Sequence, residues 1–211
     1  WSGFTLDGAT DETAFEYVTL SGAAKDFGAG MYLLSSNPTL THVSITNNRA
    51  EFSGGGMSLD FSYPNLNHVT ISNNTSERGG GMFLFYSNAT LTHVTIVNNI
   101  AESGGGMHLE HSNPILTNSI VWNNSSGSFF ISSGAPVITY SDVEGGWEGL
   151  GNIDADPLFT DPDGYDYTLQ AGSPCIDSGN PNLWYQDVDG TASDMGATGG
   201  LFVLPNFISN D

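Results

Sequence analysis

The residues best suited to chemistry in this chain lie in a short segment that recurs along it and mixes aromatic side chains with carboxylates. Ring faces pack against the C–H face of a sugar, and carboxylates accept hydrogen bonds from sugar hydroxyls. The pattern therefore predicts a carbohydrate-binding surface, unless a following loop covers the aromatic side chains. Its expected members are Tyr32, Phe83, Phe85, Tyr86 and His108.

Two carboxylates, Asp60 and Glu110, occupy equivalent positions in this segment, two copies apart. If the copies stack like neighbouring strands at ~4.8 Å, the two acids lie roughly 9–10 Å apart. That distance is at the upper end of the roughly 6.5–9.5 Å of an inverting glycosidase, although Phe85 would stand between them. Catalysis by this pair is an alternative to plain binding. A pectate-type lyase is disfavoured, because it would need an Arg or Lys base on this surface and we expect none there.

Aspartates near the C-terminus form a second candidate site. Two segments read Asp-x-Asp-Gly, and calcium takes six to eight oxygen ligands from such tight carboxylate loops. Without a distal Glu or flanking helices, they do not form an EF-hand. Asx turns without metal are the alternative. The predicted ligands of a structural Ca²⁺ are Asp161, Asp163, Asp166, Asp187 and Asp189.

These residues sit on a repeat of about 25 residues. The phrase Gly-Ala-Gly-Met at 28–31 returns as Gly-Gly-Gly-Met at 54–57, 79–82 and 104–107, and each copy ends in an Asn pair. A fixed period of this size indicates stacked structural units. Within each copy apolar residues alternate with period two, which is typical of strands. Three short strands per copy describe one coil of a parallel β-helix.

Stacked coils place equivalent side chains in columns. We expect apolar columns of Met and Leu inside, and a column of amides at a bend formed by Asn48, Asn74, Asn99 and Asn124. His42, His68 and His93 form a further column that ends in Asn118. Imidazoles stacked about 5 Å apart could share a metal, but we expect them to cap the bend instead.

Composition narrows the possible partners. The chain has 211 residues and a formal net charge of −20, so it would repel nucleic acid, and also polyanionic sugars unless calcium bridges the like charges. No apolar run is long enough to span a membrane. Cys175 is the single cysteine, which excludes an internal disulfide.

We expect a monomer. The chain begins within strand-like sequence, which suggests a piece of a longer, exported protein.

The motifs Ser-Gly-Phe-Thr-Leu, Gly-Gly-Gly-Met and His-Val-Thr-Ile-x-Asn-Asn resemble the right-handed parallel β-helix proteins of the pectate-lyase-like superfamily. The later string Asn152-Ile-Asp-Ala-Asp-Pro-Leu-Phe, with Gly-Ser-Pro-Cys-Ile-Asp-Ser-Gly, is similar to the choice-of-anchor Q module. The resemblance implies an all-β, right-handed parallel β-helix over 1–143 and an irregular acidic capping module over 144–211, packed on the helix end.

The resemblance also implies a bacterial protein that is secreted or held at the cell surface, but it implies no single activity. Together with the residues above, it favours a non-catalytic module for adhesion or for binding a polysaccharide or cell-surface glycan. The alternative is a polysaccharide-degrading enzyme, a glycoside hydrolase or lyase, that acts on the aromatic and acidic face.

Overall fold

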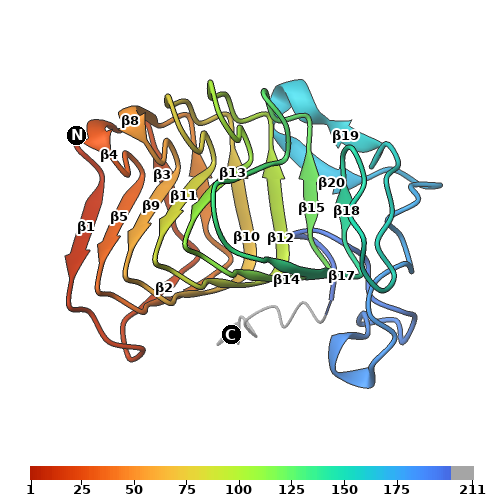
Figure 1. Cartoon of the computed structure of the whole chain (residues 1–211). Coiled ribbons are helices and arrows are strands. Elements are labelled where there is room, and N and C mark those ends of the chain that lie inside the picture. Colours follow the sequence, from red (N-terminus) through yellow and green to blue (C-terminus); the bar gives the residue numbers. More distant parts are fainter. Residues whose placement is uncertain (201–211) are drawn as a thin grey trace, which may run out of the picture.

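Copies of the repeat stack in register and wind the chain into a parallel β-helix (Figure 1). The computed structural model describes residues 1–200. Met31, Met57, Met82 and Met107 are Cα partners in successive strands, as the repeat predicts. The prediction of an all-β parallel β-helix with coils of about 25 residues is therefore confirmed.

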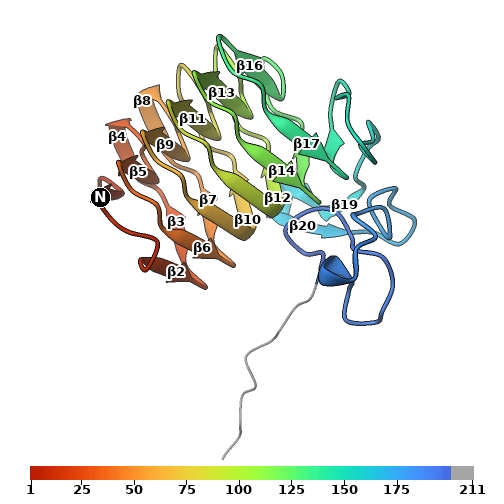
Figure 2. The same cartoon turned by 60° about the horizontal axis from the view of Figure 1, so that its bottom comes forward.

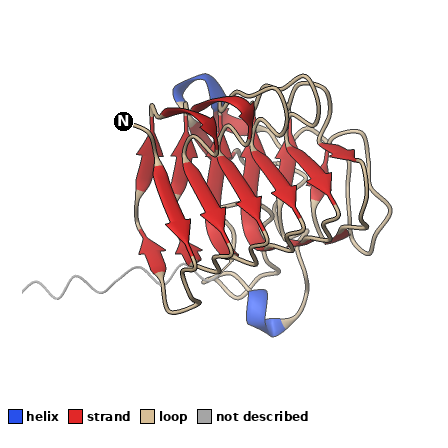
Figure 3. Cartoon of the chain, turned by 60° about the vertical axis from the view of Figure 1, so that its left-hand side comes forward, coloured by secondary structure: helices blue, strands red, loops and turns tan. Residues whose placement is uncertain are grey.

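Two long parallel sheets and one short one form the sides of the coils, and their strands align in rows along the axis (Figure 3). The first sheet runs in the order β1 (Phe4–Asp7), β5 (Met31–Leu34), β9 (Met57–Asp60), β11 (Met82–Phe85), β13 (Met107–Glu110), β16 (Phe129–Ile131). The second contains β2 (Ala14–Glu16), β6 (Thr39–Thr41), β10 (Asn65–Ser72), β12 (Thr90–Val97), β14 (Ile115–Thr117), β17 (Val137–Thr139), with β3 (Thr19–Ser21), β7 (Ser44–Thr46), β15 (Ile120–Trp122) and β18 (Asp142–Val143). The third pairs β4 (Ala24–Phe27) with β8 (Arg49–Ser53).

The core lies inside the coils and consists of the inward columns. The four stacked methionines are fully buried, and so are the leucine column and the isoleucines that face it. Burying each such side chain contributes roughly 1.5–3 kcal/mol. The Gly-Gly-Gly entry exists because a side chain would not fit there: a Cβ on Gly56 would lie 2.6 Å from the carbonyl oxygen of Gly81.

The predicted amide column is present and buried at one corner of the coils. Asn48 Nδ2 donates to Asn74 Oδ1, Asn74 Nδ2 to Asn99 Oδ1 and Asn99 Nδ2 to Asn124 Oδ1, each at 3.0 Å. Each Oδ1 also accepts the backbone N–H of the preceding member, as in Asn48 N to Asn74 Oδ1. The column thereby satisfies buried backbone N–H groups at the bend.

Residues 144–200 are irregular apart from an antiparallel hairpin of β19 (Phe159–Asp161) and β20 (Asp166–Leu169), with 3-10 helices η1 (Pro162–Gly164) and η2 (Leu183–Tyr185). The rest of the predicted capping module, 201–211, lies outside the described residues. We expected it on the helix end, where Ile153 does bridge to Asp142. Its contacts extend further, along one flank of the coils (Figure 2). Tyr167 Oη accepts from Asn73 Nδ2 at 2.8 Å, and Ala197 N donates to Thr95 Oγ1 at 2.9 Å.

The hydrophobic contact between this segment and the flank forms a second, smaller core. It contains Val97 and Ile120 of the coils and Phe159, Tyr167, Cys175 and Met195 of the C-terminal segment. Cys175 is buried and its thiol is free of any disulfide. None of the helices within residues 1–200 has the length and apolar character needed to cross a bilayer.

Candidate functional site

A column of serines shapes the turn that follows the first sheet. Ser62 Oγ accepts the N–H of Ser36 at 3.0 Å and donates to the carbonyl oxygen of Asp60 at 2.9 Å. Ser87 and Ser112 repeat the same pair of hydrogen bonds in the next coils. The residue before each serine is held in the left-handed region, which points its side chain outward. The repeat also contains this serine column, although the sequence analysis did not identify it.

The side chains held outward by this turn form an exposed stack, which we call the aromatic strip: Phe61, Tyr86 and His111. Their φ values are 52°, 47° and 50°, unusual for bulky residues. The rings of Phe61 and Tyr86 stack at 5.4 Å with an interplanar angle of 8°, and those of Tyr86 and His111 at 4.5 Å and 18°. Phe61 is 49% exposed and Tyr86 43%.

Stacking along the axis determines what the aromatic strip offers to a ligand. The inner ring faces contact each other, so the strip presents ring edges along its length, together with the Tyr86 hydroxyl and the His111 imidazole. Ser35 takes the equivalent position one coil before Phe61, so a small side chain leaves the outer face of the Phe61 ring uncovered by another ring. Edges bear partial positive charge and favour ligand oxygen atoms, whereas a free face favours C–H groups.

Phe85 and the two predicted carboxylates border the aromatic strip. The Phe85 ring meets Tyr86 edge-on at 4.7 Å, so Phe85 supports the strip from the sheet side. Asp60 and Glu110 are the register neighbours of Phe85 in the strands on either side, as expected. The structure therefore brings together Phe85, Tyr86, Asp60 and Glu110 and adds Phe61 and His111 to them.

Three other residues of the predicted binding surface, Phe83, His108 and Tyr32, are less exposed than Tyr86. Phe83 is 6% exposed and His108 3%. The guanidinium of Arg78 lies 5.1 Å from the centre of the Phe83 ring, and the Phe130 ring lies 4.6 Å from that of His108. Burial lowers the pKa of His108, against the opposing effect of Glu110. Side chains from neighbouring loops and coils thus cover this column.

Tyr32 is partly buried and hydrogen-bonded. Its hydroxyl donates to Asp60 Oδ2 at 2.6 Å, and burial together with this bond raises the pKa of Tyr32 to about 12. Glu110 Oε1 lies 3.3 Å from Arg78 Nη1 and 3.2 Å from His108 Nε2. The expectation that no Lys or Arg reaches this face is therefore wrong, since Arg78 contacts Glu110 and Lys25 lies 5.5 Å from the centre of the Tyr32 ring.

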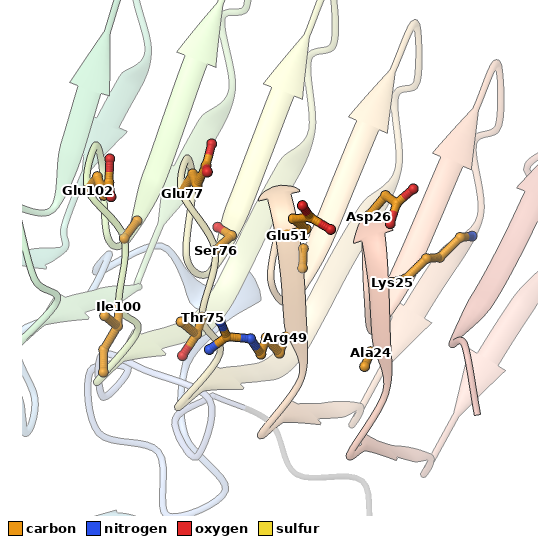
Figure 4. A pocket seen from close by; sticks show the side chains of 12 residues that line it. Ala24, Lys25, Asp26, Arg49, Glu51, Thr75, Ser76, Glu77, Ile100 and Glu102 are labelled. Atoms are coloured by element: carbon orange, nitrogen blue, oxygen red, sulfur yellow. The ribbon is translucent and has the colours of Figure 1, made fainter.

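An open groove of about 770 Å³ runs along the short third sheet, on another side of the coils. One exposed acid from each of four coils stands along it: Asp26, Glu51, Glu77 and Glu102 (Figure 4). We call these four residues the acidic column. We did not predict the acidic column from the sequence, although its members recur with the repeat. Like charges in register repel each other.

The predicted calcium ligands separate into turn residues and a triad. Asp161 accepts from Gly164 N, Asp166 from Thr168 N and Asp189 from Thr191 N, which are local turn and cap hydrogen bonds. Asp163 lies within η1. The group in residues 1–200 whose ligand atoms all lie within 4.8 Å of one another is Asp177, Asp187 and Asp194. Only Asp187 of the predicted set belongs to it.

The electrostatics of this triad suit a cation. Burial, and then the neighbouring Asp194 carboxylate, raise the pKa of Asp187 to about 6. Burial likewise raises the pKa of Asp194. Asp187 Oδ2 already accepts from Asp194 N at 3.1 Å, which helps to fix the loop. Carboxylate oxygens at this spacing could hold a metal ion such as calcium.

The histidine column stacks as predicted, with ring centres 4.8 Å apart for His42 and His68 and 4.9 Å for His68 and His93. The C-terminal segment covers it: His93 Nε2 lies 2.7 Å from Ser193 Oγ, and His68 Nδ1 lies 3.3 Å from the carbonyl oxygen of Ala197. Burial lowers the pKa of His68 to about 4 and of His93 to about 3. These neutral imidazoles join the segment to the flank.

Comparisons with known proteins agree with this architecture and go no further. The model of the family described as "Right handed beta helix region" matches residues 2–144. No curated protein and no solved structure matches the chain. The match covers most of the chain and corresponds to the coils from β1 to β18. The chain therefore belongs to the right-handed β-helix family.

Proposed function

We propose that the protein is a non-catalytic glycan-binding module that holds a neutral polysaccharide at the aromatic strip. The observation that carries the proposal is the stack of Phe61, Tyr86 and His111, which stays exposed on successive coils beside Asp60 and Glu110. Exposed aromatic rings with polar neighbours are typical of carbohydrate recognition. The strip repeats at the spacing of the coils, which suits a ligand that is itself a repeating polymer.

Charge favours a neutral ligand. The chain has a formal net charge of −20, and Asp60 and Glu110 lie beside the aromatic strip. An anionic sugar would be repelled by both, whereas neutral hydroxyls can donate to their carboxylate oxygens. His111 and the Tyr86 hydroxyl supply further polar contacts. The proposed ligand class is therefore a neutral polysaccharide rather than a uronate or sulfated one.

The side chains that contact Asp60 and Glu110 favour glycan binding over glycan hydrolysis. An inverting glycosidase needs one carboxylic acid that carries a proton to the leaving oxygen. Both carboxylates are already engaged by neighbouring side chains: Glu110 Oε1 lies 3.3 Å from Arg78 Nη1, and Asp60 Oδ2 accepts the Tyr32 hydroxyl. The polysaccharide-degrading enzyme is the alternative function, and it would use these same two residues.

A glycan array followed by product analysis tests the proposal. We expect neutral glycans to bind without release of reducing or unsaturated sugar, and the substitution Tyr86→Ser to weaken binding at least about tenfold. Serine already occupies the equivalent left-handed position at Ser35, so the turn should tolerate it. Tyr17→Ser is the matched control, because Tyr17 is exposed and left-handed at a different corner.

Two results would contradict the binding proposal. If the wild type and Tyr86→Ser bind the glycan with equal affinity, the aromatic strip is not the binding site. Product release that is abolished by Asp60→Asn or Glu110→Gln would establish the enzyme instead.

We also propose that the triad of Asp177, Asp187 and Asp194 binds a structural Ca²⁺, because its carboxylates converge without a balancing cation from the described chain. Binding to the folded state alone raises the melting temperature. We expect EDTA to lower the Tm and added CaCl₂ to restore it, with the response lost in Asp177→Asn. Asp189→Asn, in a neighbouring Asx turn, should respond like the wild type. No calcium response, or a response unaffected by Asp177→Asn, contradicts the site.

Finally, we propose that the chain acts outside the cell, secreted or at the cell surface of a bacterium, with a C-terminal segment of the choice-of-anchor Q type. The support is the residue pattern after Asn152, which resembles that module. Fractionation of cells expressing the full gene tests this location. Recovery of the protein in the cytosol alone would contradict it.

A further inference from the structure

A second cavity lies on the flank, between the coils and the C-terminal hairpin. It measures about 280 Å³, near the small end of the range of ligand pockets. One wall comes from β12 and β15 of the coils, the other from β19, η1 and the residue that follows β20. The hairpin and the coils are thus both needed to form it, and the aromatic strip takes no part in it.

The coil wall departs from the repeat at this cavity. The column that reads Thr46, Ser72 and Val97 in successive coils continues with Trp122 in register. A tryptophan in place of small side chains is not required by the stack. Trp122 packs partly against the second core and keeps part of its surface in the cavity. Together with Leu158 and Phe159 it gives the cavity an apolar side.

Three amide side chains, those of Asn98, Asn123 and Gln170, form the polar side, and hydrogen bonds orient each of them. Asn123 Nδ2 donates to Asn98 Oδ1 at 2.7 Å, and Gln170 Nε2 donates to the carbonyl oxygen of Phe159 at 2.8 Å. Within residues 1–200, Asn123 Oδ1 and Gln170 Oε1 accept no hydrogen bond. Each therefore offers a fixed acceptor to a ligand hydroxyl.

One wall is held in a costly backbone conformation. Leu158 has φ of 52°, which costs a bulky residue about 1–3 kcal/mol. Its N–H donates to Asp156 Oδ1 at 3.0 Å, and its carbonyl oxygen accepts from Gln170 N at 2.9 Å. These bonds hold the strained turn and place the Leu158 side chain, 38% exposed, at the cavity.

We propose that this cavity binds one neutral pyranose unit, with the sugar C–H face against Trp122 and its hydroxyls on Asn123 and Gln170. The volume suits a single ring, and an indole beside oriented amides matches the two sides of a sugar. The Asp156 carboxylate in the lining disfavours an acidic sugar. The proposal does not depend on the aromatic strip, so either site can exist without the other.

Ligand-observed NMR with tryptophan fluorescence tests the proposal, using neutral monosaccharides (glucose, galactose, mannose and N-acetylglucosamine) and glucuronate as the acidic comparison. We expect at least one neutral sugar to bind and to change the fluorescence, and Asn123→Gly to weaken it at least about tenfold. Glycine keeps the left-handed turn at this position, where φ is 50°. Asn47→Gly is the matched control, an equivalent left-handed asparagine two coils from the cavity wall with φ of 55°.

Further variants separate this site from the aromatic strip and from loss of folding. Tyr86→Ser should bind the monosaccharide as the wild type does. Trp122→Phe keeps an aromatic ring but removes the indole, so it should weaken binding and remove the fluorescence change. The proposal is overturned if no neutral sugar binds, if Asn123→Gly binds as tightly as Asn47→Gly, or if glucuronate binds as well as the neutral sugars.

Discussion

Asp142 is fully buried at the point where the last coil meets the C-terminal segment. Its Oδ1 accepts from Ala155 N at 3.2 Å, and the thiol of Cys175 donates to its Oδ2 at 3.2 Å. Burial raises the pKa of Asp142 to about 6, although these hydrogen bonds oppose the shift. One buried carboxyl thereby links the stability of this junction to pH.

The sign of this effect follows from proton linkage. The folded state keeps the Asp142 proton up to about pH 6, while the unfolded state loses it near pH 3.8. Stability from this group is therefore present below about pH 4 and falls as the pH rises to 6. The loss amounts to about 1–3 kcal/mol.

The substitution Asp142→Asn removes the titration, so the wild type should lose stability relative to this variant between pH 4 and 7. Chemical denaturation at both pH values measures the difference, with Asp163→Asn, at an exposed position in η1, as the control. A constant difference between the wild type and Asp142→Asn across this range would contradict the burial of an ionisable Asp142.

At the level of the elements, we expect the amide column to contribute to the stability of the coils. Asn74 receives donors from Asn48 N and Nδ2 and donates to Asn99 Oδ1 and the carbonyl oxygen of Ile45. Asn74→Ala leaves these buried groups without partners, which should lower the free energy of unfolding by at least about 3 kcal/mol.

Urea denaturation checks the loss caused by Asn74→Ala. The control is Asn88→Ala, because Asn88 is exposed and its side chain accepts the Asn113 N–H at 2.7 Å from the surface. A similar, small effect of both substitutions would show that the amide column is dispensable.

The acidic column, in contrast to the amide column, should lower the free energy of unfolding. Glu77 lies between equivalent acids of neighbouring coils, and its carbonyl oxygen accepts the N–H of Glu102 at 3.0 Å, so the backbones are held close. Glu77→Gln should stabilise the protein by about 0.2–1 kcal/mol in low salt. Because salt screens exposed charges, the gain should vanish near 1 M NaCl. A gain that is independent of salt would not be electrostatic.

For the whole molecule, the repeat predicted which side chains are neighbours in adjacent coils. It did not predict contacts between the coils and distant segments. The Met column and the Asn column follow from the 25-residue period, because equivalent residues in stacked coils must be neighbours. The turn serines and the acidic column follow from the same period and could have been identified from it. For that reason Phe85, Tyr86, Asp60 and Glu110 were placed correctly relative to one another.

The rest depends on contacts between residues far apart in the sequence. Phe83 and His108 point outward as the alternation predicts, but Arg78 and Phe130 cover them. The flank with the histidine column is covered by residues about 100 positions later, as the contact between His93 and Ser193 shows. The aspartate triad likewise joins Asp177 and Asp194 to Asp187, a convergence that Asp-x-Asp-Gly spacing does not reveal.

The most direct test of the central claim is an ¹H–¹⁵N NMR titration of the protein with the best neutral oligosaccharide from the array. If the glycan binds at the aromatic strip, amide shifts should change on successive coils at 60–63, 85–87 and 110–112. These changes should be absent in Tyr86→Ser. Shift changes confined to the acidic groove, or no change at Phe61, Tyr86 and His111, would contradict glycan binding at the aromatic strip.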